Sequence, residues 1–267
     1  MQRVAQEQRA AGFRALHEGE PFLIPNPWDA GSAKVLAGLG FKALATTSSG
    51  FAFTLGRADG AVTLDEVAAH VQALDEATAL PVSVDLENGY GPAPEDAARA
   101  IERAAAAGAV GGSIEDYDPA AERIYDREQA VERVAAASEA AARLGFPFVL
   151  TARAENHVRG NPDLDDTIER LRAFEAAGAD VLYAPGLRSG EEIAAVCGAL
   201  SKPVNVLAHR GLTLSEIVAA GAQRISVGGG LAWASVNALA AAAEEMRDAG
   251  SFGSLAAPKR LRSWLEA

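Results

Sequence analysis

Five segments of the chain share one pattern of apolar and polar positions: an Ala-rich stretch with helical spacing, a glycine, and then a short apolar run. The glycines are Gly40, Gly108, Gly145, Gly178 and Gly221. Glycine suits the left-handed backbone just past a helix end, and a short apolar run is typical of a parallel strand buried on both faces. The pattern therefore predicts helices that each lead into a buried strand.

Three more apolar runs, PFLIPNPWD, ATALPVSVDLE and KPVNVLAH, have the same strand character. Together the runs predict eight strands separated by helical stretches, at residues 22–25, 43–47, 82–86, 112–115, 148–152, 180–183, 204–207 and 223–227. Eight evenly spaced βα units in 267 residues predict an α/β protein that is a single (β/α)8 TIM-type barrel. An open, doubly wound sheet is the alternative.

The chain contains no linker rich in Pro, Gly and Ser, so residues 1–267 are predicted to form one domain. Its last segment, 255–266, is predicted to be an additional amphipathic C-terminal helix. The apolar side of that helix would carry Leu255, Leu261, Trp264 and Leu265.

Composition excludes several classes of protein. Lys and Arg number 24 against 36 Asp and Glu, a net charge of −12, which argues against binding to nucleic acid or to an anionic membrane. The single cysteine, Cys197, excludes an intramolecular disulfide and a multi-cysteine zinc site. No uncharged apolar run reaches about 18 residues, and the N-terminus lacks the apolar core of a signal peptide. We therefore expect a cytoplasmic protein with no transmembrane helix.

Acidic residues follow two neighbouring predicted strands, at the barrel end where active sites lie. Asp85 and Glu87 are two positions apart on one strand, so their side chains are expected to point the same way, and Glu115 ends the next strand. Three carboxylates in one barrel mouth repel one another unless a cation lies between them. Oxygen ligands suit Mg²⁺, with Mn²⁺ as the alternative. The simpler interpretation is that these acids pair with Arg or Lys or are solvated.

Arg153 follows the apolar run PFVLT, and spacing alone leaves two interpretations open: an ion pair with a neighbouring acid, or a clamp for a substrate carboxylate. His209 follows the seventh predicted strand and is expected to face the mouth. The glycines at 228–230 fit either a phosphate site or a tight turn. His17 and His70 lie in polar helical stretches and are expected to be solvated.

Several stretches resemble the isocitrate lyase/phosphoenolpyruvate mutase superfamily: GFKALATTSSGFA, LGRADG, TLDEV, PVSVDLENGYG, GGSIED and TAR. The most specific are VDLENGYG on the third predicted strand and IED on the fourth. The resemblance implies a (β/α)8 barrel that binds Mg²⁺. It also implies that a C–C or C–P bond beside a 2-oxo or 2-hydroxy acid is made or broken through a pyruvate-type enolate. It further implies a homo-oligomer, a dimer or tetramer, in which the C-terminal helix at 255–266 is exchanged between subunits.

Carried over by position, the resemblance assigns roles to individual residues. Asp85 resembles the main Mg²⁺-contacting carboxylate, Glu87 a second acid, and Glu115 the acid that holds metal-bound water. Asp59 resembles the acid of a gating loop, here Leu55–Gly60, and Arg153 the arginine that contacts the enolate or carboxylate. The donors that hold the substrate carboxylate would be Thr47, Ser48 and Ser49, with His209 as a further substrate-binding candidate.

The stretch after the fourth predicted strand departs from the superfamily. It reads YDPAAERIYDREQ and lacks both the Cys-and-His loop of the isocitrate lyases and the Asn-containing loop of the mutases. Glu122, Arg123, Tyr125 and His209 are candidate replacements. The sequence thus predicts a Mg²⁺-dependent lyase acting on a C–C bond of a small 2-hydroxy or 2-oxo carboxylic acid. The alternatives are C–P chemistry of the phosphonopyruvate mutase or hydrolase type, and a catalytically silent, metabolite-binding barrel.

Overall fold

A computed structural model describes the backbone of residues 2–265 and the side chains of residues 5–265. It contains eight parallel strands, each within a residue or two of its predicted place: β1 (Phe22–Ile24), β2 (Leu44–Ala45), β3 (Val82–Asp85), β4 (Gly111–Glu115), β7 (Val149–Arg153), β8 (Val181–Tyr183), β9 (Val204–Leu207) and β10 (Arg224–Ser226). The five glycines singled out by the sequence all have a positive φ, between 79° and 109°, which confirms their place just past helix ends.

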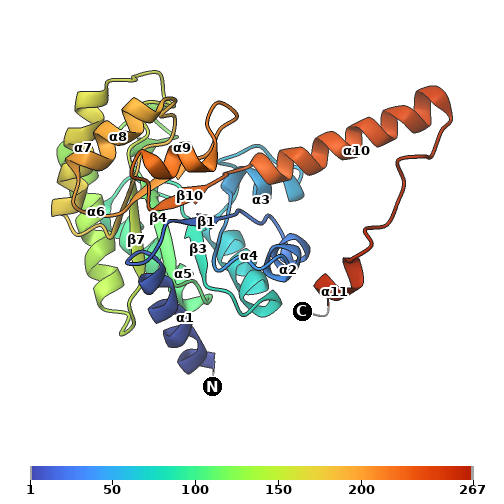
Figure 1. The fold of residues 1–267 in the computed structure, drawn as a ribbon. Coiled ribbons are helices and arrows are strands. Elements are labelled where there is room, and N and C mark those ends of the chain that lie inside the picture. The colour runs from blue at the N-terminus through green and yellow to red at the C-terminus, as the bar shows by residue number, and fades with distance from the viewer. Residues whose placement is uncertain (1, 266–267) are drawn as a thin grey trace.

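The strands follow the order β1-β10-β9-β8-β7-β4-β3-β2, and every pair is parallel. Two hydrogen bonds link the carboxyl ends of the first and last strands of this order. The Ala45 N–H donates to the Pro25 carbonyl at 3.1 Å, and Asn26 Nδ2 donates to the Thr46 carbonyl at 3.0 Å. The sheet therefore closes into the predicted TIM-type barrel rather than the open alternative (Figure 1).

Helices cover the outside of the barrel and one of its ends (Figure 1): α1 (Gln2–Leu16), α2 (Ala30–Gly38), α3 (Ser48–Thr54), α4 (Leu64–Ala77), α5 (Pro94–Ala106), α6 (Arg127–Ala142), α7 (Leu164–Ala176), α8 (Gly190–Ala199), α9 (Leu214–Ala219), α10 (Gly230–Ala249) and α11 (Leu261–Leu265). Capping boxes at Thr63, Ser189 and Thr213 start α4, α8 and α9. A small antiparallel hairpin, β5 (Tyr117–Asp118) with β6 (Arg123–Ile124), follows β4 and was not expected from the sequence.

Helix α10 projects away from the barrel, and the chain then returns so that α11 packs against α2 (Figure 1). Trp264 lies so close to Gly38 that a Cβ added there would be 2.6 Å from its ring. Residues 255–260 are not helical, because Pro258 cannot donate a helix hydrogen bond, so the C-terminal helix is shorter than the expected 255–266. Residue 266 lies outside the described part of the chain.

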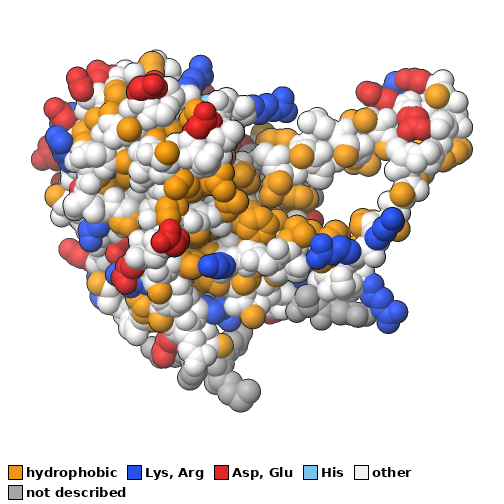
Figure 2. Space-filling model, in the orientation of Figure 1, with side chains coloured by type: hydrophobic (Ala, Val, Ile, Leu, Met, Phe, Trp, Pro, Cys, Tyr) orange, Lys and Arg blue, Asp and Glu red, His pale blue; other side chains and the backbone are white. Residues whose placement is uncertain are grey.

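The projecting segment exposes many apolar side chains, which Figure 2 shows along its length. They include Leu231, Trp233, Leu239, Met246, Phe252 and Leu255. Of these, Leu239 is 68% exposed. A large exposed apolar surface of this kind is typical of a contact with another protein surface.

The expectation that His17 and His70 are solvated was wrong, because both rings are buried. His17 donates from Nδ1 to the Phe13 carbonyl at 2.8 Å and packs edge-on against the rings of Phe13 and Phe22. His70 stacks on Phe51 with ring centroids 4.0 Å apart. Within residues 2–265, no helix is long and apolar enough to cross a membrane.

Candidate active site

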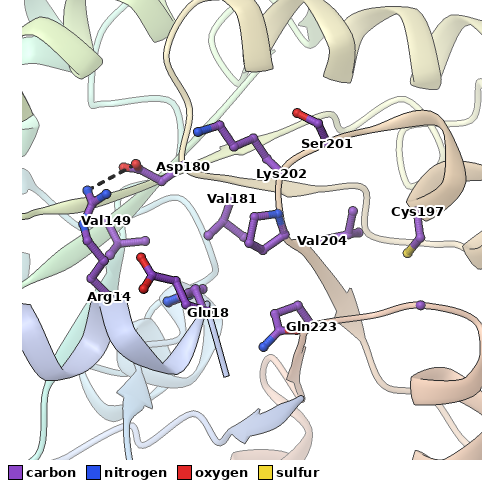
Figure 3. A pocket seen from close by; sticks show the side chains of 13 residues that line it. Arg14, Glu18, Val149, Asp180, Val181, Cys197, Ser201, Lys202, Val204 and Gln223 are labelled. Carbon is purple, nitrogen blue, oxygen red and sulfur yellow. Dashed lines mark hydrogen bonds and ion pairs between the residues drawn. The ribbon is translucent and has the colours of Figure 1, made fainter. Parts of the chain in front are cut away.

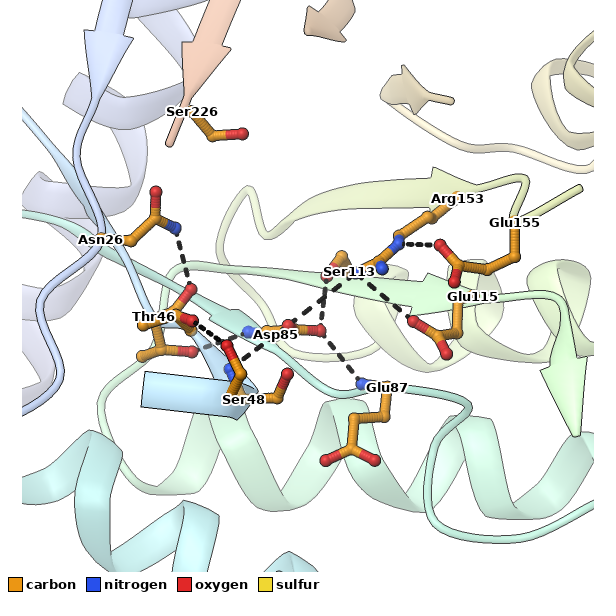
Figure 4. A network of polar contacts seen from close by, with 12 residues as sticks. Asn26, Thr46, Ser48, Asp85, Glu87, Ser113, Glu115, Arg153, Glu155 and Ser226 are labelled. Carbon is orange, nitrogen blue, oxygen red and sulfur yellow. Dashed lines mark hydrogen bonds and ion pairs between the residues drawn. The ribbon is translucent and has the colours of Figure 1, made fainter. Parts of the chain in front are cut away.

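The carboxyl ends of β3, β4 and β7 bring together Asp85, Glu115 and Arg153, each the last residue of its strand (Figure 4). Glu115 and Arg153 are direct neighbours in the register of β4 and β7. They lie at the mouth of the barrel, where a cavity of about 70 Å³ is lined by Asp85, Arg153, Tyr183 and other polar side chains. The structure therefore places Asp85, Glu115 and Arg153 together at the end of the barrel where the sequence predicted the site.

Arg153 lies at the centre of this cluster. Its Nη1 is 3.4 Å from Glu115 Oε2 and 3.9 Å from Asp85 Oδ2, and its Nε donates to Glu155. Burial alone would lower the pKa of Arg153, but the carboxylates of Glu115 and Glu155 hold it well above its usual range. Arg153 is thus both paired with acids and placed at the cavity, so the two interpretations of this residue are compatible.

Asp85 is fixed by the segment that follows β2. Its backbone N–H donates to Thr46 Oγ1 at 2.8 Å, and its Oδ2 accepts from the Ser48 N–H at 3.4 Å. Thr47 caps α3 by accepting from the Gly50 N–H at 3.3 Å, and its hydroxyl is 3.2 Å from that of Ser49. Of the predicted substrate-binding residues, Ser48 therefore contacts Asp85 directly, and Thr47 and Ser49 adjoin it in the chain.

Glu87 does not share the orientation of Asp85, which was the expectation from strand spacing. The strand β3 ends at Asp85, and Glu87 adopts a left-handed backbone with φ of 48°. Its side chain turns away from Asp85 (Figure 4) into a neighbouring cavity that Gly60 and Tyr90 also line. Burial, and then the charges of Asp85 and Asp59, raise the pKa of Glu87 to about 8. Asp59 itself is exposed on the loop after α3.

The donor set suits a hard divalent cation. Within residues 5–265, no three His, Cys, Asp or Glu side chains stand together as a ready-made metal cage, because Arg153 separates Asp85 from Glu115 and Glu87 is turned aside. The oxygens of Asp85 nevertheless accept only long contacts, 3.2 to 3.5 Å, so they keep acceptor capacity. Three acids, Asp85, Glu115 and Glu155, contact the two guanidiniums of Arg153 and Arg159 here, so acidic groups outnumber cations at this mouth. Oxygen ligands and unbalanced negative charge fit Mg²⁺.

His209 stands apart from this group. Its Nδ1 accepts from the Gly211 N–H at 3.0 Å within its own loop, and its Nε2 is buried without a hydrogen-bond partner. Tyr125, considered as a replacement for the missing loop residues, is fully buried and its hydroxyl accepts from Asn88 Nδ2 at 3.0 Å. The structure therefore gives Tyr125 a packing role, and the hydrogen bond of His209 stays within its own loop.

The sequence assigned no role to four charged or polar residues of the site: Glu155, Arg159, Tyr183 and Arg224. Arg224 is buried beneath the mouth, where it donates to Asn205 Oδ1 at 2.8 Å and to Thr151 Oγ1 at 2.9 Å. Burial lowers the pKa of Arg224 to about 10. The available signal was a charged residue at the start of the apolar strand Arg224–Ser226. A buried charge is costly unless it has hydrogen-bond partners, so polar partners inside the barrel were to be expected.

Another cavity, about 440 Å³, lies at the opposite end of the barrel, beside the first residues of β7, β8 and β9 (Figure 3). Its charged side chains include Arg14 and Asp180, which pair at 3.3 Å. Cys197 lines it, and burial raises the pKa of this thiol to about 11. The one cysteine is therefore not an activated nucleophile.

Known proteins share the sequence and fold of this chain. The family model described as phosphoenolpyruvate phosphomutase matches residues 13–247. A solved lyase or mutase from Burkholderia cenocepacia is 51% identical, with 99% of this chain and 98% of that chain covered and a TM-score of 0.95. An oxaloacetate decarboxylase from Rhodopseudomonas palustris is 31% identical, with 97% of this chain and 89% of the relative covered.

A solved oxaloacetate acetylhydrolase, in complex with its product oxalate, is 28% identical, with 96% of this chain and 93% of that chain covered and a TM-score of 0.87. The likeness extends over nearly the whole barrel in each case. The chain belongs to the isocitrate lyase/phosphoenolpyruvate mutase superfamily of lyase and mutase enzymes.

Proposed function

We propose that this chain is a Mg²⁺-dependent lyase that cleaves a C–C bond of a small 2-oxo or 2-hydroxy carboxylic acid through a pyruvate-type enolate. One observation carries the proposal: three strand ends place the guanidinium of Arg153 within 4 Å of the carboxylates of both Asp85 and Glu115 at the barrel mouth. Oxaloacetate is the first substrate to test, because relatives over nearly the whole length are an oxaloacetate decarboxylase and an oxaloacetate acetylhydrolase.

Asp85 would hold the metal directly, with Glu115 and Glu87 as the supporting acids. When bound, Mg²⁺ (or Mn²⁺) supplies positive charge next to the oxygen on which negative charge develops. Asp85 suits this role because its carboxylate is oriented by the backbone of Ser48 and Glu87 and still has acceptor capacity.

The chain's own cation, Arg153, would hold the carboxylate or enolate oxygen of the substrate through its planar guanidinium. The hydroxyls of Thr47, Ser48 and Ser49 would donate to the substrate carboxylate from beside Asp85. His209, whose Nε2 has no partner, would bind substrate from the edge of the site. Closure of the loop at 55–60, which carries Asp59, would exclude water from the enolate.

We also propose that the protein is a cytoplasmic homo-oligomer, dimer or tetramer, built from one barrel domain. The exposed apolar surface of α10 and the segment after it supports an exchange of the C-terminal helical region between subunits. Partners of other classes are not expected: the acidic charge disfavours nucleic acid and anionic membranes.

The activity is tested by following oxaloacetate by NMR with EDTA-treated protein, before and after Mg²⁺ is restored. Because Mg²⁺ alone promotes loss of CO₂ from oxaloacetate, protein-free samples and the Asp85→Asn variant serve as controls. We expect Mg²⁺-dependent turnover that exceeds both controls. Turnover of 3-phosphonopyruvate but of no C–C substrate would favour the C–P alternative, and binding without turnover of either class would favour the silent barrel.

A further inference from the structure

A second arginine reaches the same carboxylates as Arg153. Arg159 lies on the loop after β7, where its Nε is 3.1 Å from Glu155 Oε2 and its Nη2 is 3.7 Å from Glu115 Oε1. Glu155 and Glu115 are therefore each shared between Arg153 and Arg159. The two guanidiniums thus contact the same pair of buried acids, Glu115 and Glu155.

The two arginines differ in how deeply they are buried and in how many carboxylates they contact. The Arg153 side chain is 19% exposed and contacts three carboxylates, whereas that of Arg159 is 38% exposed. The 3.7 Å separation from Glu115 exceeds hydrogen-bond length, so that contact is a loose ion pair. Partly exposed ion pairs contribute little to stability, so Arg159 can exchange Glu115 for another anion at small cost.

Tyr117 fixes the position of this looser cation. The guanidinium carbon of Arg159 lies 3.6 Å from the centre of the Tyr117 ring, a close cation–π contact. Tyr117 belongs to the β5–β6 hairpin, the stretch in which this chain departs from the loops of the isocitrate lyases and mutases. The ring covers one face of the guanidinium, while the N–H groups in its plane contact Glu155 through Nε and, loosely, Glu115 through Nη2. Release of the loose Glu115 contact would free N–H groups of the kind that bind a carboxylate.

We propose that Arg159 binds the second, distal carboxylate of the substrate and so makes the site selective for dicarboxylates. This inference rests on the proposed function, in which Arg153 and the Thr47–Ser49 segment hold the reacting end. The four site acids, Asp85, Glu87, Glu115 and Glu155, repel an incoming dianion. A positioned cation at the rim would offset that repulsion at the end of the substrate remote from Arg153.

The test compares two unreactive ligands by calorimetry in Mg²⁺: oxalate, which has no distal group, and 3,3-difluorooxaloacetate, which has one. Arg159→Gln should weaken binding of difluorooxaloacetate about 10- to 100-fold, the loss of a charge-assisted contact, and change oxalate binding less than about twofold. Arg159→Lys should restore part of the loss. The matched control is Arg143→Gln. Arg143 is an exposed arginine just after the last residue of α6, where it pairs with Glu102, so its replacement should change the binding of neither ligand.

Equal weakening of both ligands by Arg159→Gln would make Arg159 a structural partner of Glu155 and overturn the inference, as would unchanged binding of difluorooxaloacetate. Tighter binding of 3-phosphonopyruvate than of difluorooxaloacetate by the unaltered protein would overturn the assignment of a carboxylate as the distal group. Failure of the unaltered protein to bind oxalate would instead overturn the proposed function, so the two failures are distinguishable. Circular dichroism of each variant shows that it is folded.

Discussion

Arg153 and Glu115 are direct partners in the register of β7 and β4, and Nη1 of Arg153 lies 3.4 Å from Oε2 of Glu115. Both residues end their strands, so the pairing is set by the barrel register and not by a loop. Rigid elements hold functional groups more accurately than loops do. The geometry of the proposed site therefore depends on the closed barrel itself.

Replacing Arg153 by Lys tests the role of this geometry. In the unaltered protein, Arg153 contacts Glu155 through Nε and Glu115 and Asp85 through Nη1. A lysine offers a single ammonium group and cannot make these contacts at once. Substrate carboxylates should therefore bind about 10- to 100-fold more weakly to the variant. Oxalate titration of the variant measures the effect. An unchanged dissociation constant would mean that Arg153 serves only to pair with the surrounding acids.

Tyr125→Phe separates packing from chemistry in the stretch after β4. The change removes the hydrogen bond from Asn88 to a fully buried hydroxyl, so the free energy of unfolding should fall by about 1 kcal/mol. Because the ring faces the core, kcat should stay within about twofold. Urea unfolding and steady-state kinetics check both parts. A large fall in kcat with unchanged stability would place Tyr125 in the reaction.

His17 gives the protein a specific sensitivity to acid. Burial, and then the charge of Arg224, lowers the pKa of His17 from 6.5 to about 3. Between these pH values, His17 is protonated in the unfolded chain but stays neutral in the folded protein. Stability from this group is complete above pH 6.5 and declines as the pH falls toward 3.

Urea unfolding at pH 7 and pH 5 measures this contribution. The unaltered protein should lose about 2 kcal/mol more than His17→Gln over that interval, because the variant has no proton to bind. Parallel losses in the two proteins would show that His17 titrates normally in the folded state.

Leu239→Glu tests the role of the projecting helix α10. Leu239 is 68% exposed in the single chain, so a charge there should disrupt the proposed subunit contact and lower the mass measured by light scattering. Asn237→Glu, two positions earlier and thus on the opposite side of the helix, adds the same charge and should leave the mass unchanged. An unaltered protein that is monomeric would contradict the exchange of the C-terminal region.

Most of the barrel could be predicted from the sequence because its signals are local. Gly178, for example, has a positive φ and follows a helix end, and the apolar run after it forms a buried strand. Both features can be recognised from a few neighbouring residues, without reference to distant parts of the chain. His17 shows the opposite case. Its polar neighbours along α1 suggest solvation, but the rings of Phe13 and Phe22 and the carbonyl of Phe13 bury it, and Phe22 belongs to another element.

The site was predictable where it sits on strands and less so on loops. Asp85, Glu115 and Arg153 end their strands, so the parallel barrel brings them together as expected. Glu87 was expected on the same face as Asp85, but β3 ends before it and the backbone turns its side chain away. Arg159 was missed because its contacts with Glu155 and Tyr117 depend on how two loops fold against each other.

The central claim is that Asp85 and Arg153 form a site for a metal-dependent, enolate-like ligand, and oxalate binding tests it most directly. Calorimetry should show tight binding of oxalate, a planar mimic of the pyruvate enolate, in the presence of Mg²⁺ and little binding in EDTA. Asp85→Ala should abolish the Mg²⁺-dependent part while the protein stays folded. Equal binding with and without Mg²⁺, or Mg²⁺-dependent binding that survives Asp85→Ala, would contradict the account.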